Sequence, residues 1–208
     1  DNMLLSKLCR NNVRSITNNS ATSRLINALP SSTSSVQKRE YSTVGKAPYG
    51  EFHHRNLYVQ KSKNLKAKTP YENLVFGKTF TDYMLEVSWT EKEGWSKPRI
   101  VPYHNLELPP STSSLHYALQ CFEGMKAYKS EDGNDVFLFR PEMNATRLNK
   151  SCARLGLPNF MNQEFIKCLA ELVVLEKDWI PNQFGYSLYI RPTVISTEET
   201  LGVLPPKS

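Results

Sequence analysis

Two strand-like runs on either side of a short polar turn constrain this chain most, because together they predict a β-hairpin. The runs cover residues 122–128 and 136–139, and Glu131-Asp132-Gly133-Asn134 lies between them. An Asp-Gly pair tolerates the positive φ angles that hairpin turns require. Gly124, inside the first run, has no side chain and therefore permits another group to approach the backbone closely. The sequence predicts an antiparallel strand pair in which Gly124 permits another group to come close.

Two helices are predicted directly after the hairpin. Pro141 opens the first, since a proline at the first helical position loses no hydrogen bond, and Gly156 ends it after about Leu155. The second helix begins with Asn162 as its N-cap. Its buried stripe consists of apolar residues at helical spacing, namely Phe165, Ile166, Leu169, Leu172, Val173 and Trp179.

Further strands are predicted on both sides of this segment. Residues 83–89 alternate between apolar and polar in the manner of a strand, and residues 99–101 return as its partner after a turn at Glu93-Gly94. Residues 186–196 form a long apolar strand. Loops are predicted at 106–114 and 197–208, where prolines and polar residues gather. Strands and helices do not alternate regularly, so the fold class is α+β.

The charge of the chain argues against nucleic-acid binding. The 208 residues carry a formal net charge of +6, but residues 1–41 hold six basic and two acidic residues, which leaves 20 basic against 18 acidic residues in the rest. A nearly neutral body lacks the electrostatic footprint of a DNA or RNA binder. Apolar runs are also too short to span a bilayer, so no membrane partner is predicted.

The N-terminus is typical of a mitochondrial transit peptide. Residues 3–39 are basic, rich in Ser and Asn, and contain no acidic residue. Arg39-Glu40-Tyr41-Ser42 resembles the cleavage pattern of the matrix protease. The sequence thus predicts a transit peptide at 1–41, an arm at 42–75, a domain at 76–208 and a location in the mitochondrial matrix. A disordered polar tail is the alternative interpretation of the N-terminus.

The cysteines and histidines predict neither a disulfide framework nor a metal site. Cys9, Cys121, Cys152 and Cys168 are scattered, and one lies in the predicted transit peptide, which favours reduced thiols. His53-His54 is the close histidine pair of the sequence, but adjacent side chains point in different directions on a regular element.

Two arginines and a set of apolar residues are candidates for a binding site. Arg147 lies within two turns of Pro141, where helix geometry favours anions and a guanidinium can hold a phosphate by two bonds. Arg191 lies in the apolar run YIRP and needs a partner if it is buried. Helical arginines are mostly solvated and aromatic residues mostly pack in cores, so the residues alone leave both interpretations open. The candidates for an apolar pocket are Phe76, Tyr117, Phe122, Tyr189, Leu201 and Val203.

Four long strings resemble the mitochondrial branched-chain amino acid aminotransferases, a family of fold-type IV enzymes that use pyridoxal 5'-phosphate. They are ENLVFGKTFTDYML at 72–85, KPRIVPYHNLELPPSTSSLHYALQCFEGMKAY at 97–128, RPEMNATRLNKSCARLGLP at 140–158 and SLYIRP at 187–192. The resemblance implies amino transfer between leucine, isoleucine or valine and 2-oxoglutarate. It also implies that the chain forms the small N-terminal domain of the fold-type IV fold, which the D-amino acid aminotransferases share.

The resemblance gives each candidate residue a role. Arg147 would contact the phosphate of the cofactor, and Phe76, Phe122 and Tyr189 would line the substrate pocket. Tyr117, Leu201 and Val203 match residues that the family lends to the neighbouring active site, which implies a homodimer. Tyr117, Tyr189 and Arg191 would supply donors to the substrate carboxylates.

The resemblance also implies that the Schiff-base lysine belongs to a C-terminal domain that would follow Ser208. No catalytic residue is therefore predicted in this chain. Neither Lys126 nor Lys207 matches the position of that lysine. The chain is then either part of a working aminotransferase or a truncated, inactive product that binds a full-length subunit. A D-amino acid aminotransferase or an aminodeoxychorismate lyase is a third interpretation, although those enzymes generally lack the strings before residue 115.

Overall fold

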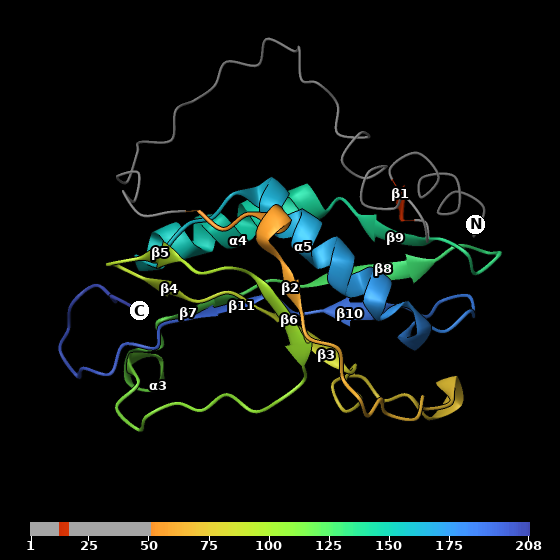
Figure 1. The fold of residues 1–208 in the computed structure, drawn as a ribbon, viewed down its shortest axis with the longest axis horizontal. Coiled ribbons are helices and arrows are strands. Elements are labelled where there is room, and N and C mark those ends of the chain that lie inside the picture. The colour runs from red at the N-terminus through yellow and green to blue at the C-terminus, as the bar shows by residue number, and fades with distance from the viewer. Residues whose placement is uncertain (1–12, 17–50) are drawn as a thin grey trace, which may run out of the picture.

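The computed structural model describes residues 13–16 and 51–208, in which two long helices follow one another and lie on one side of the central strands (Figure 1). Strands and helices are mixed along the chain without regular alternation, which confirms the predicted α+β class. The predicted import signal lies outside the described residues, apart from 13–16. The helices are α3 (Ser113–Tyr117), α4 (Pro141–Leu155) and α5 (Asn162–Leu175), and the 3-10 turns are η1 (His54–Asn56), η2 (Tyr71–Asn73) and η3 (Lys177–Trp179).

The central strands are all antiparallel. They are β1 (Val13–Ile16), β7 (Gln120–Phe122), β8 (Met125–Lys129), β9 (Val136–Phe139), β10 (Leu188–Ile190) and β11 (Thr193–Ile195). One sheet has the order β1-β9-β8-β10, and β11 pairs with β7 beside it. The predicted hairpin is confirmed, since β8 and β9 pair with Ala127 opposite Leu138 and the turn falls at residues 130–134.

The β7–β11 and β8–β10 pairs are two halves of one ladder, separated by an interruption that we call the seam (Glu123, Gly124, Arg191 and Pro192). The register is the same on both sides of the seam, because Phe122 lies opposite Thr193 and Met125 lies opposite Ile190. The backbone N–H of Glu123 donates to the carbonyl oxygen of Pro192 at 2.9 Å. Proline has no N–H, so it cannot return that bond.

The seam corrects two predictions. Residues 122–128 and residues 186–196 do not form unbroken strands, because each run stops at the seam and resumes beyond it. Apolar composition alone predicts a continuous strand, whereas Pro192 removes a ladder bond from the middle of the run.

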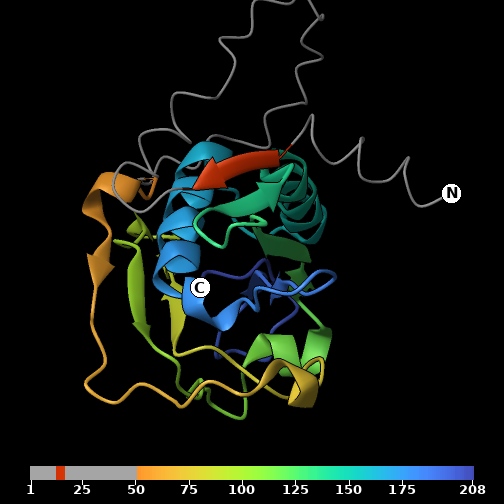
Figure 2. The same ribbon diagram turned by 90° about the vertical axis from the view of Figure 1, so that its right-hand side faces the viewer.

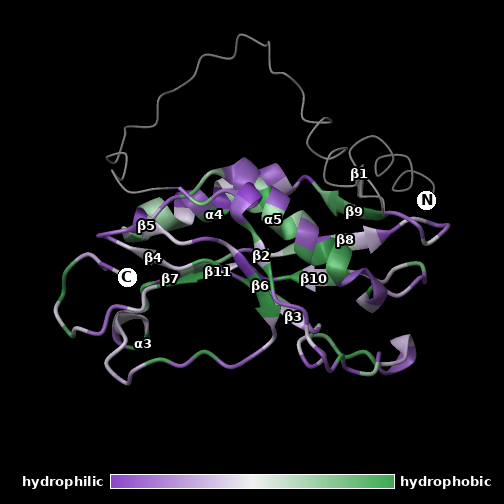
Figure 3. Cartoon of the chain, in the orientation of Figure 1, coloured by the Kyte–Doolittle hydropathy of each residue, from purple (hydrophilic) through white to green (hydrophobic). Residues whose placement is uncertain are grey.

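The main core lies between α5 and the β8–β9 hairpin. Alternate residues of each strand face the helix, which is the two-residue period of a sheet with one buried face. In Figure 3 apolar residues gather on the strands and polar residues on the outer side of α4. The buried members of this cluster are Met125, Ala127, Val136, Leu138, Leu169, Ala170, Val173 and Ile180.

A second sheet packs on the other side of α5, so that this helix lies between two sheets (Figure 2). Its order is β2-β6-β3, with β2 parallel and β3 antiparallel to β6. The strands are β2 (Tyr58–Val59), β3 (Tyr83–Glu86) and β6 (Arg99–Pro102), and a small hairpin joins β4 (Trp89–Thr90) to β5 (Gly94–Trp95). The predicted partnership of β3 and β6 is confirmed, but β3 ends at Glu86 and Trp89 belongs to the hairpin.

Residues 51–75 take part in the packed structure. Phe52 is buried, and its ring lies 5.5 Å from that of Trp95 and 6.1 Å from that of Phe160. Strand β2 adds an edge to the second sheet. The division at residue 75 between an arm and a domain stays a prediction.

The two long helices match their predicted limits, with two corrections. Helix α5 ends at Leu175, so Trp179, predicted in its buried stripe, lies beyond it in η3, although its side chain is buried. Helix α4 begins at Pro141 and ends at Leu155, as predicted. Met161, and not Asn162, is the N-cap of α5. The Asn162 side chain instead donates to Thr146 Oγ1 at 3.0 Å and accepts from Asn149 Nδ2 at 2.7 Å. These bonds join α4 to α5, and a cap pattern in the sequence cannot reveal them because they depend on tertiary contact.

Two acidic side chains are buried where β3 meets the end of α5, and we call them the carboxyl pair (Asp82 and Glu176). Asp82 accepts from Lys68 Nζ at 2.8 Å, from the Lys66 N–H at 2.8 Å and from Trp179 Nε1 at 2.8 Å. Burial alone would raise the pKa of Asp82, but these bonds outweigh it and lower that pKa below its ordinary value. Burial raises the pKa of Glu176 to about 7, against the hydrogen bond from the Tyr83 N–H, and the charge of Asp82 adds to the rise.

Substitution of Gly156, at the end of α4, is expected to destabilise the fold. It has a φ of 72°, in the left-handed region, where a Cβ is strained. Replacing Gly156 with alanine should lower the free energy of unfolding by about 1 kcal/mol. Chemical denaturation checks this, with Gly202→Ala as the comparison, because an added Cβ there would meet no atom of the described structure within 4 Å. An unchanged midpoint for Gly156→Ala would contradict the assignment of the cap.

Candidate functional site

Four of the predicted substrate-binding residues come together beside the seam. The rings of Phe76 and Tyr189 meet edge to face with centroids 5.1 Å apart. The Arg191 guanidinium lies over the ring of Phe122 at 4.2 Å and donates to Tyr189 Oη at 2.8 Å and 3.2 Å. Phe76 and Phe122 are exposed, at 76% and 60%, so this aromatic cluster faces outward. Phe76, Tyr189 and Arg191 also line one open groove that runs along β3 and β10.

The position of Tyr189 depends on Gly124. A Cβ placed on Gly124 would lie 3.1 Å from Tyr189 Cζ and still closer to its hydroxyl oxygen, inside van der Waals contact. The close approach that Gly124 permits does occur, and the group that approaches is the Tyr189 ring. Since Tyr189 Oη accepts from Arg191, its own O–H remains available to a ligand as a donor.

Arg147 lies on α4 and is paired with Glu123 of the seam. Nε donates to Oε1 at 2.8 Å and Nη2 donates to Oε2 at 2.6 Å, which makes a two-bonded fork. Asn144 Nδ2 donates to Glu123 Oε2 at 2.7 Å and to the carbonyl oxygen of Gly124 at 3.0 Å. The hydrogen bonds from Arg147 lower the pKa of Glu123, so this carboxylate is ionised.

The remaining candidates form a second group on the α3 side. Tyr117, at the end of α3, donates from its hydroxyl to the carbonyl oxygen of Leu201 at 2.5 Å. Leu201 and Val203 lie in the predicted loop 197–208, and Val203 is 88% exposed. Helix α3 begins at Ser113, inside the loop predicted at 106–114. The Ser113 and Ser196 hydroxyls hydrogen-bond at 2.6 Å, which fastens α3 to the end of β11.

Glu123 and Asn144 are the residues of the site that the sequence did not single out. Both lie within the strings FEGMKAY and RPEMNATRL, but their roles depend on α4 lying beside the seam. The adjacency of Glu123 to Gly124 was an available signal, because a carboxylate beside a glycine can bond back to its own backbone. Here the Gly124 N–H donates to Glu123 Oε2 at 3.2 Å.

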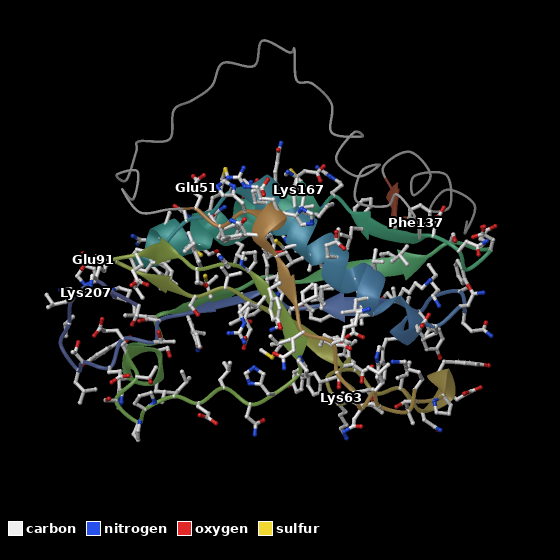
Figure 4. All side chains as sticks on the ribbon, viewed as in Figure 1. Glu51, Lys63, Glu91, Phe137, Lys167 and Lys207 are labelled. Atoms are coloured by element: carbon white, nitrogen blue, oxygen red, sulfur yellow. The ribbon has the colours of Figure 1, made fainter. Side chains whose placement is uncertain are left out.

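Lys207 lies apart from this arrangement, at the β4–β5 turn. Its ammonium is 3.8 Å from Glu91 Oε2, and the Glu91 N–H donates to the Lys207 carbonyl oxygen at 2.9 Å (Figure 4). Within residues 13–16 and 51–208, His, Cys, Asp and Glu side chains do not gather in a group that could hold a metal ion. In the same part of the chain, helices are too short or too polar to cross a membrane.

Comparison with known proteins identifies relatives over most of the described residues, although no family model matches the chain. The branched-chain-amino-acid aminotransferase of Dictyostelium discoideum is 54% identical over 144 residues, which cover 66% of this chain and 38% of that protein. The mitochondrial enzyme of Rattus norvegicus is 48% identical over 160 residues (76% and 40%), and the cytosolic enzyme of that species is 45% identical over 155 residues (74% and 38%).

Among solved structures, the Escherichia coli branched-chain amino acid aminotransferase matches with a TM-score of 0.42 and 25% identity, over 51% of this chain and 34% of that one. The assignment rests on the sequence relatives, of whose length the chain spans about two fifths. Over the matched residues, the chain is a member of the branched-chain-amino-acid aminotransferase family.

Proposed function

We propose that this chain forms the substrate-facing wall of a pyridoxal 5'-phosphate-dependent aminotransferase of fold type IV. Its reaction would move an amino group between leucine, isoleucine or valine and 2-oxoglutarate. The observation that carries the proposal is the aromatic cluster around Tyr189 and Arg191. Its member Phe122 directly precedes Glu123, which pairs with Arg147. The apolar and carboxylate-binding side chains thus adjoin an anion-binding residue at the seam.

Arg147 fits a phosphate group. A guanidinium has five N–H donors in a planar fork, and Glu123 engages two of its nitrogens. The Arg147 side chain is 62% exposed, so its remaining donors are open to an anion. Pyridoxal phosphate, when bound, supplies an electron sink for the reacting carbon of the amino acid. In this proposal Arg147 anchors its phosphate, while Glu123 and Asn144 fix the direction of the guanidinium.

The aromatic cluster suits an α-amino or α-keto acid with a branched side chain. Arg191 and the Tyr189 O–H can donate to a carboxylate, and a charged donor makes such hydrogen bonds stronger. Phe76 and Phe122 offer apolar surface to the aliphatic side chain and exclude water from it. Hydrogen-bond donors and apolar rings thus lie next to each other. This arrangement would let the same wall accept a branched-chain amino acid and 2-oxoglutarate in turn.

Dimerisation and location belong to the same proposal. Tyr117, Leu201 and Val203 form an exposed edge on the α3 side, held together by the hydrogen bond from Tyr117 to Leu201. We infer that this edge completes the neighbouring site in a homodimer. The basic stretch at 3–39, which contains no acidic residue, supports import into the mitochondrial matrix.

The test is transamination by the protein made from the complete reading frame that contains this chain, because the relatives are longer. With added cofactor, leucine, isoleucine and valine should each convert 2-oxoglutarate to glutamate. D-alanine is the comparison donor and should give little product. Preferential turnover of D-alanine, or a lack of turnover with all three branched-chain donors, would refute the proposal.

Arg147→Gln is expected to weaken cofactor binding about tenfold, because one charge-assisted phosphate contact is lost. Equilibrium dialysis against pyridoxal phosphate measures this without any need for turnover. Arg154→Gln, on the same helix but exposed near its C-terminal end, is the matched control and should bind as the parent does. Equal weakening in both variants would show that Arg147 acts only through the overall charge of α4.

A further inference from the structure

Two thiols on different elements lie next to each other beneath the seam. Cys121 is on β7 and Cys152 is on α4, and their sulfur atoms are 3.6 Å apart. Both are free cysteines, although 31 positions of sequence separate them. Cys152 is fully buried with Leu148 and Leu157, whereas Cys121 is partly exposed at the edge of this cluster.

The geometry is close to that of a disulfide. A disulfide bond is about 2.0 Å long, so the sulfur atoms, now 3.6 Å apart, need to approach by about 1.6 Å. The surrounding side chains are apolar, among them Leu155 and Val194, and they offer the sulfur atoms little competition as hydrogen-bond partners. Each thiol is therefore the nearest reaction partner of the other.

We propose that Cys121 and Cys152 form an oxidation site, a dithiol that hydrogen peroxide converts into a disulfide between β7 and α4. Cys121 attacks one peroxide oxygen and becomes a sulfenic acid, while the other oxygen leaves as water after taking up the thiol proton. Cys152 then attacks the Cys121 sulfur, the S–O bond breaks, and a second water leaves with the Cys152 proton. Two thiols are oxidised and one peroxide is reduced.

The order of the two steps follows from burial. Cys121 is the thiol that a small oxidant can reach, and Cys152 is placed to resolve the sulfenic acid. Burial raises the pKa of both thiols, so the thiolate fractions are small and the first step is slow at neutral pH. The second step is intramolecular between sulfur atoms already in contact, which favours closure over further oxidation.

The site is independent of the proposed function, because it requires only the contact of β7 with α4. Formation of the disulfide would nevertheless affect two elements of the proposed binding site. Cys121 directly precedes Phe122 and Glu123, and Cys152 lies on the helix that carries Arg147. The disulfide would tie the strand of the aromatic cluster to the helix of the phosphate anchor.

The experiment treats the full chain with hydrogen peroxide, blocks the remaining thiols and maps peptides without reduction. The expected product is a single linked pair of peptides containing Cys121 and Cys152, lighter by two hydrogen atoms, with a raised melting temperature that returns to its starting value after reduction. In Cys152→Ser, dimedone should label Cys121 as a trapped sulfenic acid. Cys168→Ser is the matched control, since Cys168 is equally buried but lies on α5, and it should leave the linkage intact.

Other products would overturn the inference. Linkage of either cysteine to Cys168 or to a second molecule would show that contact in the fold does not direct the reaction. Continued alkylation of both Cys121 and Cys152 in the unfolded, peroxide-treated protein would show that they do not oxidise together. Dimedone labelling of Cys121 at equal extent in the parent and in Cys152→Ser would show that Cys152 does not resolve the sulfenic acid.

Discussion

Replacing Gly124 with alanine is expected to reduce the catalytic efficiency of the proposed transamination about a hundredfold, because a displaced binding group has effects of that order. The added Cβ would enter the space of the Tyr189 hydroxyl and lie 3.1 Å from Cζ. The Tyr189 ring is rigid, and Phe76 and Arg191 hold it from other directions, so it cannot yield without leaving its place. Overpacking of this kind should also lower the free energy of unfolding by about 1–3 kcal/mol.

Two measurements separate the causes. Steady-state kinetics with leucine should show the loss in the Gly124→Ala enzyme, and thermal unfolding should show the destabilisation. Adding Tyr189→Phe removes the hydroxyl that clashes, so the double variant should regain part of the stability while the activity stays low. Gly202→Ala is the control for unfolding, since in the described structure its Cβ would meet no atom within 4 Å. Parent-like kinetics and stability in Gly124→Ala would show that Tyr189 does not depend on this glycine.

The free energy of unfolding is expected to fall by about 3 kcal/mol as the pH rises from about 4.5 to about 7, owing to Glu176. Burial raises the pKa of Glu176 to about 7 in the folded protein, whereas an unfolded glutamate keeps the ordinary value of 4.5. Between these values the folded state holds the proton and the unfolded state releases it. Stability from this group is therefore complete below the unfolded pKa and is lost as the pH rises through the folded pKa.

Glu176→Gln should flatten this part of the pH profile, because glutamine stays neutral and its carbonyl oxygen can still accept from the Tyr83 N–H. Urea unfolding midpoints at a series of pH values measure the slope. Glu199→Gln, at an exposed position in the loop after β11, should retain the slope of the parent. A parent slope that persists in Glu176→Gln would assign the titration to another group. Asp82 acts in the opposite sense, because its pKa is lowered in the folded protein. Its contribution to stability is lost only when the pH falls far enough to protonate the folded carboxylate.

Local patterns predicted the elements whose causes are local. The Asp132-Gly133 turn set the hairpin, and Pro141 and Gly156 set the limits of α4, because turn and cap preferences act within a few residues. The seam escaped prediction because two segments create it together. Pro192 removes a bond from one strand, and its effect on residue 123 appears only after the two strands pair.

The binding residues were found by resemblance, while their contacts required the fold. The hydrogen bond from Tyr117 to Leu201 spans 84 positions of sequence, and the Arg147 fork reaches 24 positions back to Glu123. Charge and hydropathy do not reveal which carboxylate an arginine will meet. Asn162 is a comparable case, since its side chain serves the contact between two helices instead of capping its own helix.

The seam also bears on how such a domain can change over evolutionary time. Its position depends on the imino acid at residue 192, a matter of covalent chemistry, and not on the volume of neighbouring side chains. Mutations that reshape the hydrophobic interior on either side can accumulate without shifting the point where the two half-ladders meet. As long as Gly124 and Pro192 are kept, Tyr189 and Arg191 therefore hold their positions while the core residues around them change.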